Sequence, residues 1–313
     1  MDDKDEGVAI GGDAGGVAPR RIVRVGTEGA LSGENGDHHA GYAQAVILVG
    51  GEGTRLRPIT SRVPKPAAPL MGRPFVSYIL ENLARHGVDR AVFSTGYLAA
   101  AIEAEVGDGR RFGMEVRYAT EDVPLGTAGA IKNAESELRP GGFVVFNGDI
   151  LCDVDLTALI AFHRRTRGAA TLLVTEVEDT HRYGLVEVGH GGRIASFVEK
   201  PGADAGGPGL INAGVYVLEH DVLEMIPPRR ETSIERGVFP DLAALGTLHA
   251  FVGGGYWRDI GTPQSYLEAH YDLLQDPRLA GDGVGAGGPL AVAPGARIER
   301  GARIVPPARI ESG

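Results

Sequence analysis

Residues 45–66 read AVILVGGEGTRLRPITSRVPKP, and the architecture of the chain follows from how this segment is built. Its first five residues are apolar and mostly β-branched, a run long enough for one buried strand and too short for most helices. Gly50, Gly51 and Gly53 follow at once, and glycines leave room for backbone N–H groups to surround an anion. The segment therefore predicts a buried strand that ends in a phosphate-binding loop.

Three cationic side chains accompany the loop: Arg55, Arg57 and Lys65, the last of which stands between two prolines that restrict the backbone. A Walker loop requires Gly-Lys-Ser/Thr after its glycines, and the segment lacks that sequence. The dinucleotide fingerprint requires a third glycine where Leu56 stands, which excludes a dinucleotide-dependent oxidoreductase. The phosphate groups must therefore be bound by a different motif.

The segment resembles the signature of the sugar-nucleotide pyrophosphorylases, or nucleotidyltransferases: G-G-x-G-T-R-L-x-P-x-T followed by P-K-P. Residues 50–66 carry every letter of it. The resemblance implies that Arg55 and Lys65 are catalytic cations that neutralise a departing pyrophosphate. It also implies that the nucleotide is bound by the loop residues Gly50, Gly51, Gly53 and Thr54.

Three further segments match the part of this family that binds the nucleotide and the metal ion. Residues 121–130, EDVPLGTAGA, are most similar to the mannose-1-phosphate guanylyltransferase branch, which implies nucleotide contacts at Glu121, Gly126 and Thr127. Taken alone, this segment could be an ordinary loop before a helix. The motifs N-G-D at 147–149 and Y-W-R-D-I-G-T at 256–262 resemble those that hold Mg²⁺, a cation that needs only one or two carboxylates from the protein. The residues implied are Gly148 at the nucleotide, and Asp149 and Asp259 as catalytic metal ligands.

The sugar-phosphate side of the family is matched by three short motifs. In F-V-E-K-P at 197–201, the resemblance assigns Lys200 to the phosphate of a sugar-1-phosphate, as a catalytic residue, and Glu199 to a sugar hydroxyl. The motif I-N-A-G-V-Y at 211–216 and the Tyr-Gly pair at 183–184 add the substrate-binding residues Gly184, Asn212 and Gly214. Residues 232–236, TSIER, also resemble the guanylyltransferase branch, and we interpret them as structural.

Composition limits the class of protein and its partners. The chain has 313 residues, 43% of them apolar and 23% charged, which is typical of a globular protein of about two domains. A net charge of −10 without a basic cluster argues against nucleic acid or an anionic membrane as partner. A single cysteine, Cys152, an acidic N-terminus and the lack of a membrane-length apolar run lead us to expect a cytoplasmic protein.

The pattern along the chain divides it into three parts. Residues 1–42 are rich in glycine and acidic side chains, and we expect them to be disordered. Residues 43–276 form the nucleotidyltransferase domain, with a nucleotide half at about 43–154 and a more antiparallel sugar-phosphate half at about 155–276. Strand-like runs at 45–49, 90–95, 114–119 and 143–146 alternate with helical patterns, which predicts an α/β fold: a Rossmann-like mixed sheet flanked by helices. The family resemblance makes this core GT-A-like.

Residues 277–313 contain a glycine-rich linker and four hexads, LAVAPG, ARIERG, ARIVPP and ARIESG. Val292, Ile298, Ile304 and Ile310 recur every six residues, the period of a hexapeptide β-helix. We expect a short left-handed β-helix remnant of little more than one coil. It is too short to bury its own core, which favours a homo-oligomer. The alternative is an Ala/Arg-rich tail with an accidental period.

The motifs together imply an enzyme that transfers a nucleoside monophosphate from a nucleoside triphosphate, GTP above all, to a sugar-1-phosphate, above all mannose-1-phosphate. A phosphate monoester loses its second proton near pH 6, so it attacks the α-phosphorus without a protein base, and pyrophosphate leaves. Alternatives are another sugar- or cyclitol-1-phosphate, another base, or a non-catalytic paralogue that senses nucleotide sugars.

Overall fold

The computed structural model describes residues 42–96, 98–199, 207–280, 290–293, 295–299, 302 and 308–310. Residues 1–41 of the expected N-terminal extension lie outside this set, and so does Lys200. Among the described residues, no helix combines the length and the apolar character that crossing a membrane requires.

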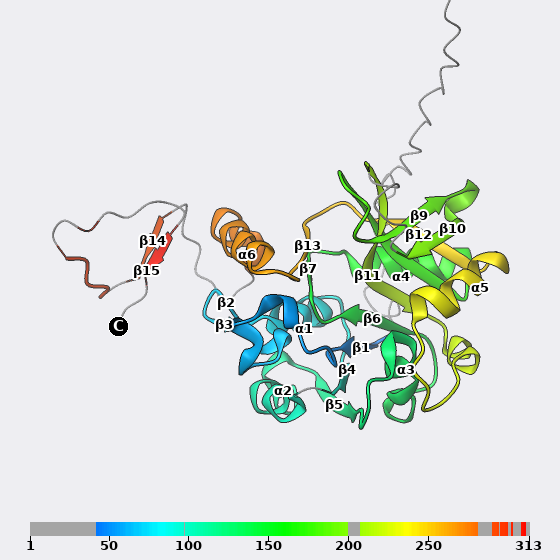
Figure 1. The fold of residues 1–313 in the computed structure, drawn as a ribbon, viewed down its shortest axis with the longest axis horizontal. Helices are drawn as coiled ribbons and strands as arrows, with labels where there is room; N and C mark the ends of the chain where they lie inside the picture. Colours follow the sequence, from blue (N-terminus) through cyan, green and yellow to red (C-terminus); the bar gives the residue numbers. More distant parts are fainter. Residues whose placement is uncertain are drawn as a thin grey trace, which may run out of the picture. The chain divides into compact units, whose positions relative to one another are not determined.

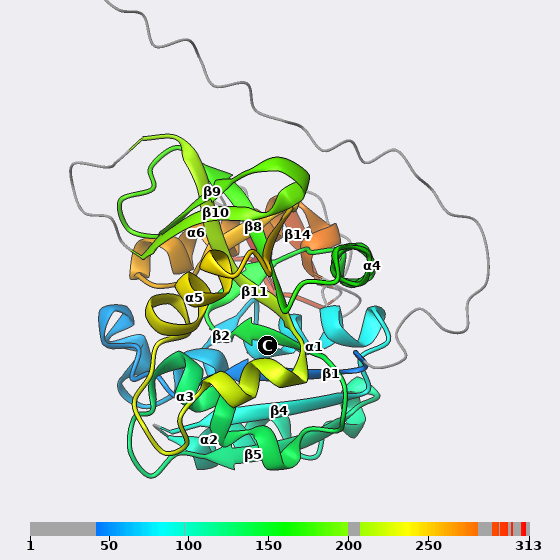
Figure 2. The same cartoon turned by 90° about the vertical axis from the view of Figure 1, so that its right-hand side faces the viewer.

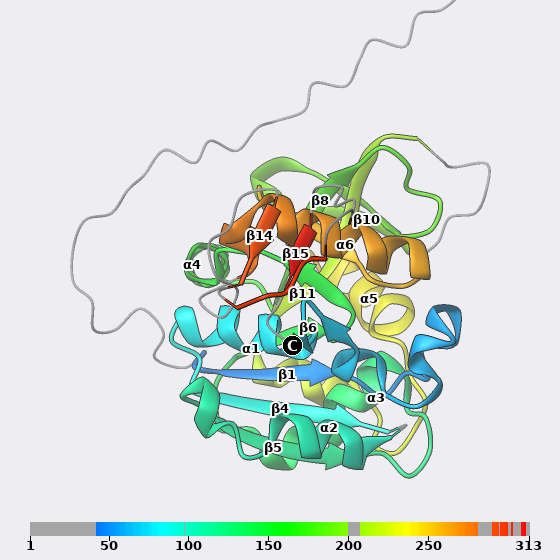
Figure 3. The ribbon, with the colours of Figure 1, turned by 90° about the vertical axis from the view of Figure 1, so that its left-hand side faces the viewer.

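Strand β1 (Gln44–Leu48) lies at the centre of a parallel group of four strands (Figure 1). It pairs with β4 (Arg90–Thr95) on one side and with β6 (Phe143–Asn147) on the other, while β5 (Glu115–Thr120) continues the sheet beyond β4. β1, β4 and β5 are neighbouring arrows with the same direction in Figure 3. The four strands predicted in this half are confirmed. β1, β4 and β6 have the apolar runs that are typical of parallel strands buried on both faces.

Helices cover both faces of the sheet, because alternate strand residues point to opposite sides. Ala45 and Ile47 belong to one hydrophobic cluster, and Val46 between them belongs to another. The first cluster is covered by α1 (Val76–Arg85), α2 (Ala99–Val106) and α4 (Leu156–Thr166). The second is covered by α3 (Gly126–Asn133), the π-helix Ile234–Val238 and α5 (Phe239–Ala244).

The second half of the sheet is mostly antiparallel, as the sequence predicts. β11 (Gly209–Leu218) pairs with β6, and its other neighbours are β8 (Ala170–Val177) and β9 (Gly184–Val188). β9 and β10 (Ile194–Glu199) form a hairpin, whose turn holds two glycines at positive φ, and they lie at the end of the sheet away from β5 (Figure 2). A strand that the sequence analysis missed, β12 (Leu248–Val252), pairs in parallel with β8. The expected mixed α/β sheet is confirmed.

Two short strand pairs and one helix complete the site-bearing part of the fold. β2 (Pro69–Leu70) pairs with β3 (Arg73–Pro74), and β7 (Ile150–Cys152) pairs with β13 (Trp257–Asp259). Helix α6 (Pro263–Gln275) begins with a capping box between Thr262 and Ser265, and it buries Ala269 and Leu273 against the start of α1. The β7–β13 pair brings two segments together that are over a hundred positions apart in the sequence.

The hexad region contains one parallel pair, β14 (Leu290–Val292) with β15 (Ala308–Ile310). Leu290 pairs with Ala308 and Val292 with Ile310, so each partner lies three hexads further along the chain. Three hexads per turn is the repeat that a hexapeptide coil requires. The left-handed β-helix itself stays a prediction, because many residues of this region lie outside the described set.

A buried histidine makes the stability of the fold depend on pH. The His163 side chain is 1% exposed, with Nδ1 2.8 Å from Thr171 Oγ1 and Nε2 3.2 Å from Glu219 Oε1. Burial lowers the pKa of His163, although the Glu219 carboxylate opposes the shift. Because the native state favours the neutral ring, its stabilising contribution is complete above the unfolded pKa of about 6.5 and is lost as pH falls below it.

We therefore expect the free energy of unfolding in urea to fall between pH 7.5 and pH 5, and to fall less in His163→Gln. The exposed His181, which pairs with Asp179 at the surface, provides the matched control. His181→Gln should retain the wild-type pH dependence. Equal pH dependence in His163→Gln and wild type would show that burial of His163 does not contribute to it.

Candidate active site

The glycine loop leaves β1 at the edge where the parallel strands end. Gly53 has φ of 60° and begins the 3₁₀ turn Thr54–Leu56. A Cβ at Gly53 would lie 3.1 Å from Thr60 Cγ2 and 3.3 Å from Lys65 Cβ, and Thr60 Oγ1 donates a 2.7 Å hydrogen bond to Gly53 O. Both the positive φ and this close packing favour glycine at position 53.

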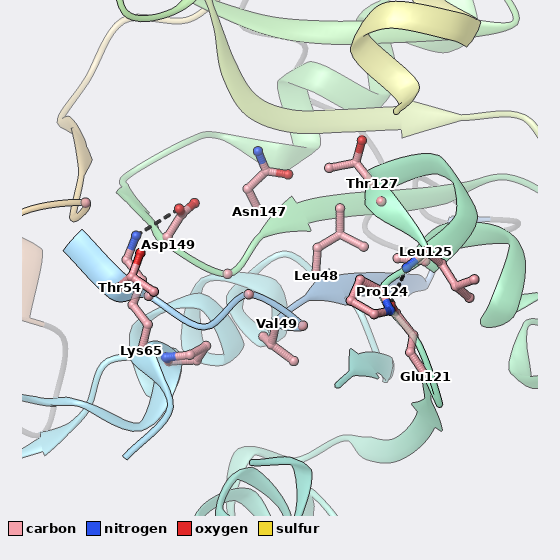
Figure 4. A pocket seen from close by; sticks show the side chains of 18 of the residues that line it. Leu48, Val49, Thr54, Lys65, Glu121, Pro124, Leu125, Thr127, Asn147 and Asp149 are labelled. Atoms are coloured by element: carbon pink, nitrogen blue, oxygen red, sulfur yellow. Dashed lines mark hydrogen bonds and ion pairs between the residues drawn. The ribbon is translucent and has the colours of Figure 1, made fainter. Parts of the chain in front are cut away.

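The loop forms one wall of a cavity of about 440 Å³, which we call the nucleotide cavity (Figure 4). Glu121 stabilises another wall: its Oε1 accepts a 3.0 Å hydrogen bond from Ser94 Oγ, and its Oε2 accepts one of 3.0 Å from Leu125 N. All eight residues expected at the nucleotide line this cavity: Gly50, Gly51, Gly53, Thr54, Glu121, Gly126, Thr127 and Gly148.

Two carboxylates and one ammonium group meet beside the nucleotide cavity. Lys65, which is 9% exposed, places Nζ 2.9 Å from Asp149 Oδ2 and 3.9 Å from Asp259 Oδ1. The β7–β13 pair holds the two aspartates together, since Ile260 N donates a 2.9 Å hydrogen bond to Asp149 O. Burial and the Asp149 charge raise the pKa of Asp259, against the opposing effect of Lys65 and Arg55.

The donor set at Asp149 and Asp259 fits a hard divalent cation. Asp259 Oδ1 is buried and accepts no hydrogen bond from a described residue. A bound cation would provide this oxygen with a partner. The described part of the chain holds no cluster of three or more His, Cys, Asp or Glu side chains able to bind a metal. Mg²⁺ is the cation that such a site suits, because it takes its remaining ligands from water and substrate phosphates.

Arg55 lies next to this pair, whereas Arg57 does not. A Cβ at Gly261 would lie 3.2 Å from Arg55 Nη2 and 3.0 Å from Asp259 Oδ1, so a glycine there leaves room for both side chains. Arg57 lies 3.6 Å from Glu52 at the surface. It lines no cavity described here. The expected convergence of three cations therefore holds for Arg55 and Lys65 only.

A second, more polar cavity of about 210 Å³, the sugar cavity, lies beside the first. It is lined by the four residues expected at the sugar: Gly184, Glu199, Asn212 and Gly214. Asn212 Oδ1 accepts a 3.0 Å hydrogen bond from Gly214 N, and Asn212 Nδ2 donates one of 3.0 Å to Tyr216 OH. Tyr216 is fully buried, and burial raises the pKa of its phenol well above the usual value.

The two cavities share the residues Arg55, Asn147 and Asp149. Asn147, which lies between Asp149 and Thr127 in Figure 4, has a buried Oδ1 without a partner among the described residues. Gly214, with φ of 76°, makes room for it, since a Cβ there would lie 2.9 Å from Asn147 Nδ2. A ligand that spans both cavities must therefore pass Arg55, Asn147 and Asp149.

Among the residues that line the sugar cavity, sequence reasoning missed the polar side chains of Asn147, Arg182 and Glu235. Asn147 is the first letter of the matched N-G-D motif and Arg182 precedes the matched Tyr-Gly pair, and these positions are the signal that could have found them. Glu235 lies in the segment TSIER, which the sequence analysis interpreted as structural; its carboxylate reaches the cavity. Lys200 lies outside the described residues, so its expected role stays a prediction.

Comparison with known proteins agrees with this geometry. A family model described as nucleotidyl transferase matches residues 44–276. The chain is 40% identical to a mannose-1-phosphate guanylyltransferase of Mycobacterium tuberculosis, over 85% of this chain and 78% of that protein. It is 37% identical to the mannose-1-phosphate guanylyltransferase catalytic subunit beta of Dictyostelium discoideum, over 82% and 72%.

A solved structure resembles the fold and the sequence together. HddC from Yersinia pseudotuberculosis, in a crystal structure with GMP-PN, is 35% identical with a TM-score of 0.64, over 74% of this chain and 99% of that one. The residues that the family model matches include every residue that lines the two cavities. The chain belongs to the nucleotidyl transferase family.

Proposed function

We propose that the protein transfers a guanylyl group from GTP to mannose-1-phosphate, which yields GDP-mannose and pyrophosphate. The observation that carries the proposal is that two cavities meet at Arg55, Asn147 and Asp149. The nucleotide cavity is bordered by the glycine loop, which suits phosphate groups, and the sugar cavity is bordered by polar groups that suit a sugar. The identity of base and sugar is supported by the relatives, which are named mannose-1-phosphate guanylyltransferases.

The chain's own groups act by positioning and by charge. Backbone N–H groups of the glycine loop bind the triphosphate, and Arg55 at the junction neutralises charge on the pyrophosphate as it leaves. Lys200 binds the phosphate of the sugar-1-phosphate. Since that phosphate is already an anion at neutral pH, no side chain needs to remove a proton before the in-line attack on the α-phosphorus.

Asp149 and Asp259 would hold Mg²⁺, which supplies positive charge to phosphate oxygens when bound. Lys65 lies between both carboxylates and offsets their mutual repulsion, so they can remain close together before a cation or a substrate arrives. We further propose that the hexads form one coil of left-handed β-helix that joins copies of the chain, and that the protein works in the cytoplasm.

The test is pyrophosphate release with Mg²⁺, in which GTP, ATP, UTP, CTP and dTTP are each paired with mannose-1-phosphate and glucose-1-phosphate. We expect GTP with mannose-1-phosphate to give a turnover of about 1 to 10³ per second, the usual range for enzymes. Binding of GTP without turnover of either sugar would refute mannose-1-phosphate as the acceptor. If no triphosphate bound, the transferase proposal would be wrong and a non-catalytic role would replace it.

A further inference from the structure

The segment before the π-helix Ile234–Val238 is attached to the start of α3, which borders the nucleotide cavity. Thr232 O accepts a 2.9 Å hydrogen bond from Ala128 N, and Thr232 N donates one of 2.8 Å to Leu125 O. Gly126 has φ of 68°, and a Cβ there would lie 2.7 Å from Thr232 O. These contacts join the backbone of the segment directly to the wall of the nucleotide cavity.

Within this attachment, one oxygen of Glu235 is fixed by two hydroxyl groups. Glu235 Oε2 accepts 2.6 Å hydrogen bonds from Thr127 Oγ1 and from Ser233 Oγ. Thr127 Oγ1 in turn accepts a 2.9 Å hydrogen bond from Ile234 N. Hydrogen bonds to a carboxylate are short and strong, so this network sets the direction of the whole group.

The other oxygen, Glu235 Oε1, accepts no hydrogen bond from a described residue, and no described cation lies within ion-pair distance of the carboxylate. Glu235 lines the sugar cavity together with Glu199 and Asn212. Its charge also contributes to the raised pKa of the buried Tyr216. Glu235 is partly exposed, and the hydroxyl groups of a sugar ring are hydrogen-bond donors that suit a carboxylate lining this cavity.

We propose that Glu235 is a specificity-determining residue that binds a ring hydroxyl of the sugar-1-phosphate through Oε1. Thr127, although it lines the nucleotide cavity, is the positioning residue that holds this carboxylate. The proposal rests on the proposed function and deepens it. The proposal also gives Thr127 a role other than recognition of the nucleotide base, because the Thr127 hydroxyl already donates its hydrogen to Glu235.

The test compares Glu235→Gln with Glu231→Gln, an exposed neighbour on the same segment that lines neither cavity. Glutamine keeps the size of the group but offers only one acceptor oxygen, which Thr127 and Ser233 retain. We expect KM for the sugar-1-phosphate to rise about 10- to 100-fold, as for loss of a hydrogen bond to a charged group, while KM for GTP changes less than about threefold. Glu231→Gln should leave both KM values unchanged.

Thr127 provides the second arm. Thr127→Val removes the hydroxyl from the nucleotide cavity, yet the proposal expects it to raise KM for the sugar-1-phosphate more than KM for GTP. Thr127→Ser, which keeps the hydroxyl, should restore wild-type values. If Thr127→Val affected only the KM for GTP, Thr127 would act on the nucleotide directly and its positioning role would be wrong.

Monodeoxy analogues of mannose-1-phosphate identify the hydroxyl. Wild type should discriminate against one analogue by roughly 10-fold or more, and Glu235→Gln should lose that discrimination and no other. Unchanged discrimination against every analogue would overturn the proposal. Calorimetric binding of mannose-1-phosphate to wild type and Glu235→Gln makes the same comparison without turnover. Weaker binding to Glu235→Gln than to wild type would support the role of Glu235 even if wild type released no pyrophosphate. Absence of pyrophosphate release would count against the proposed reaction alone.

Discussion

Replacement of Asp149 by Asn is expected to lower kcat by about 10³-fold or more, because a bound metal supplies several kcal/mol of charge stabilisation and each 1.36 kcal/mol is tenfold in rate. Asp149 follows β6, pairs with Lys65 at 2.9 Å and lines both cavities. Asparagine keeps the shape of the side chain but loses its charge, so the cation should be held weakly. The measurements are pyrophosphate release and Mn²⁺ binding by electron paramagnetic resonance, each with GTP present.

The matched control is Asp153→Asn, four positions along the same segment. Asp153 lies 3.8 Å from Arg85 with a half-exposed side chain, and it lines neither the nucleotide nor the sugar cavity. We expect Asp153→Asn to keep wild-type turnover and Mn²⁺ affinity. An Asp149→Asn protein that remained folded, bound Mn²⁺ as tightly as wild type and kept its turnover would show that the cation site lies elsewhere.

The parallel half of the sheet was predictable, because its strands carry their signal locally. β4 begins and ends at the predicted residues, and each end of β1 lies one residue before its predicted position. β1, β4 and β6 are buried along most of their length, so each contains an apolar run between segments of helical period. The pairing of β7 with β13 had no such signal, since two three-residue strands find each other only through the tertiary fold.

The candidate site was predictable wherever a residue belongs to a motif that is contiguous in the sequence. Residues of the glycine loop line the nucleotide cavity, and residues of the sugar-side motifs line the sugar cavity. Glu235 was assigned a structural role because its bond to Thr127 spans 108 positions and is invisible in either motif alone. Arg57 shows the opposite error: proximity in sequence to the loop did not determine the direction of its side chain, which turns to Glu52.

Arg55→Ala is expected to lower kcat by about 10²- to 10³-fold, the usual effect of removing one preorganised donor to developing charge. Arg55 lines both cavities, and its guanidinium forms no ion pair with a described carboxylate. Arg55 therefore contributes little to the stability of the free protein. We therefore expect the melting temperature to stay close to that of wild type. Pyrophosphate release and a thermal melt on the same preparation measure both quantities.

Arg57 supplies the comparison that separates position from charge. Arg57→Ala removes the same charge two residues away, but from a surface side chain that lines neither cavity, and we expect its kcat to stay within about twofold of wild type. Arg55→Lys should be intermediate, because lysine keeps the charge and loses the planar fork that binds phosphate oxygens in pairs. Equal losses in Arg55→Ala and Arg57→Ala would mean that net positive charge near the loop is what matters. Near-normal turnover in Arg55→Ala would leave Lys65 as the other cation that lines the nucleotide cavity, and Lys65 could neutralise the pyrophosphate only by leaving Asp149.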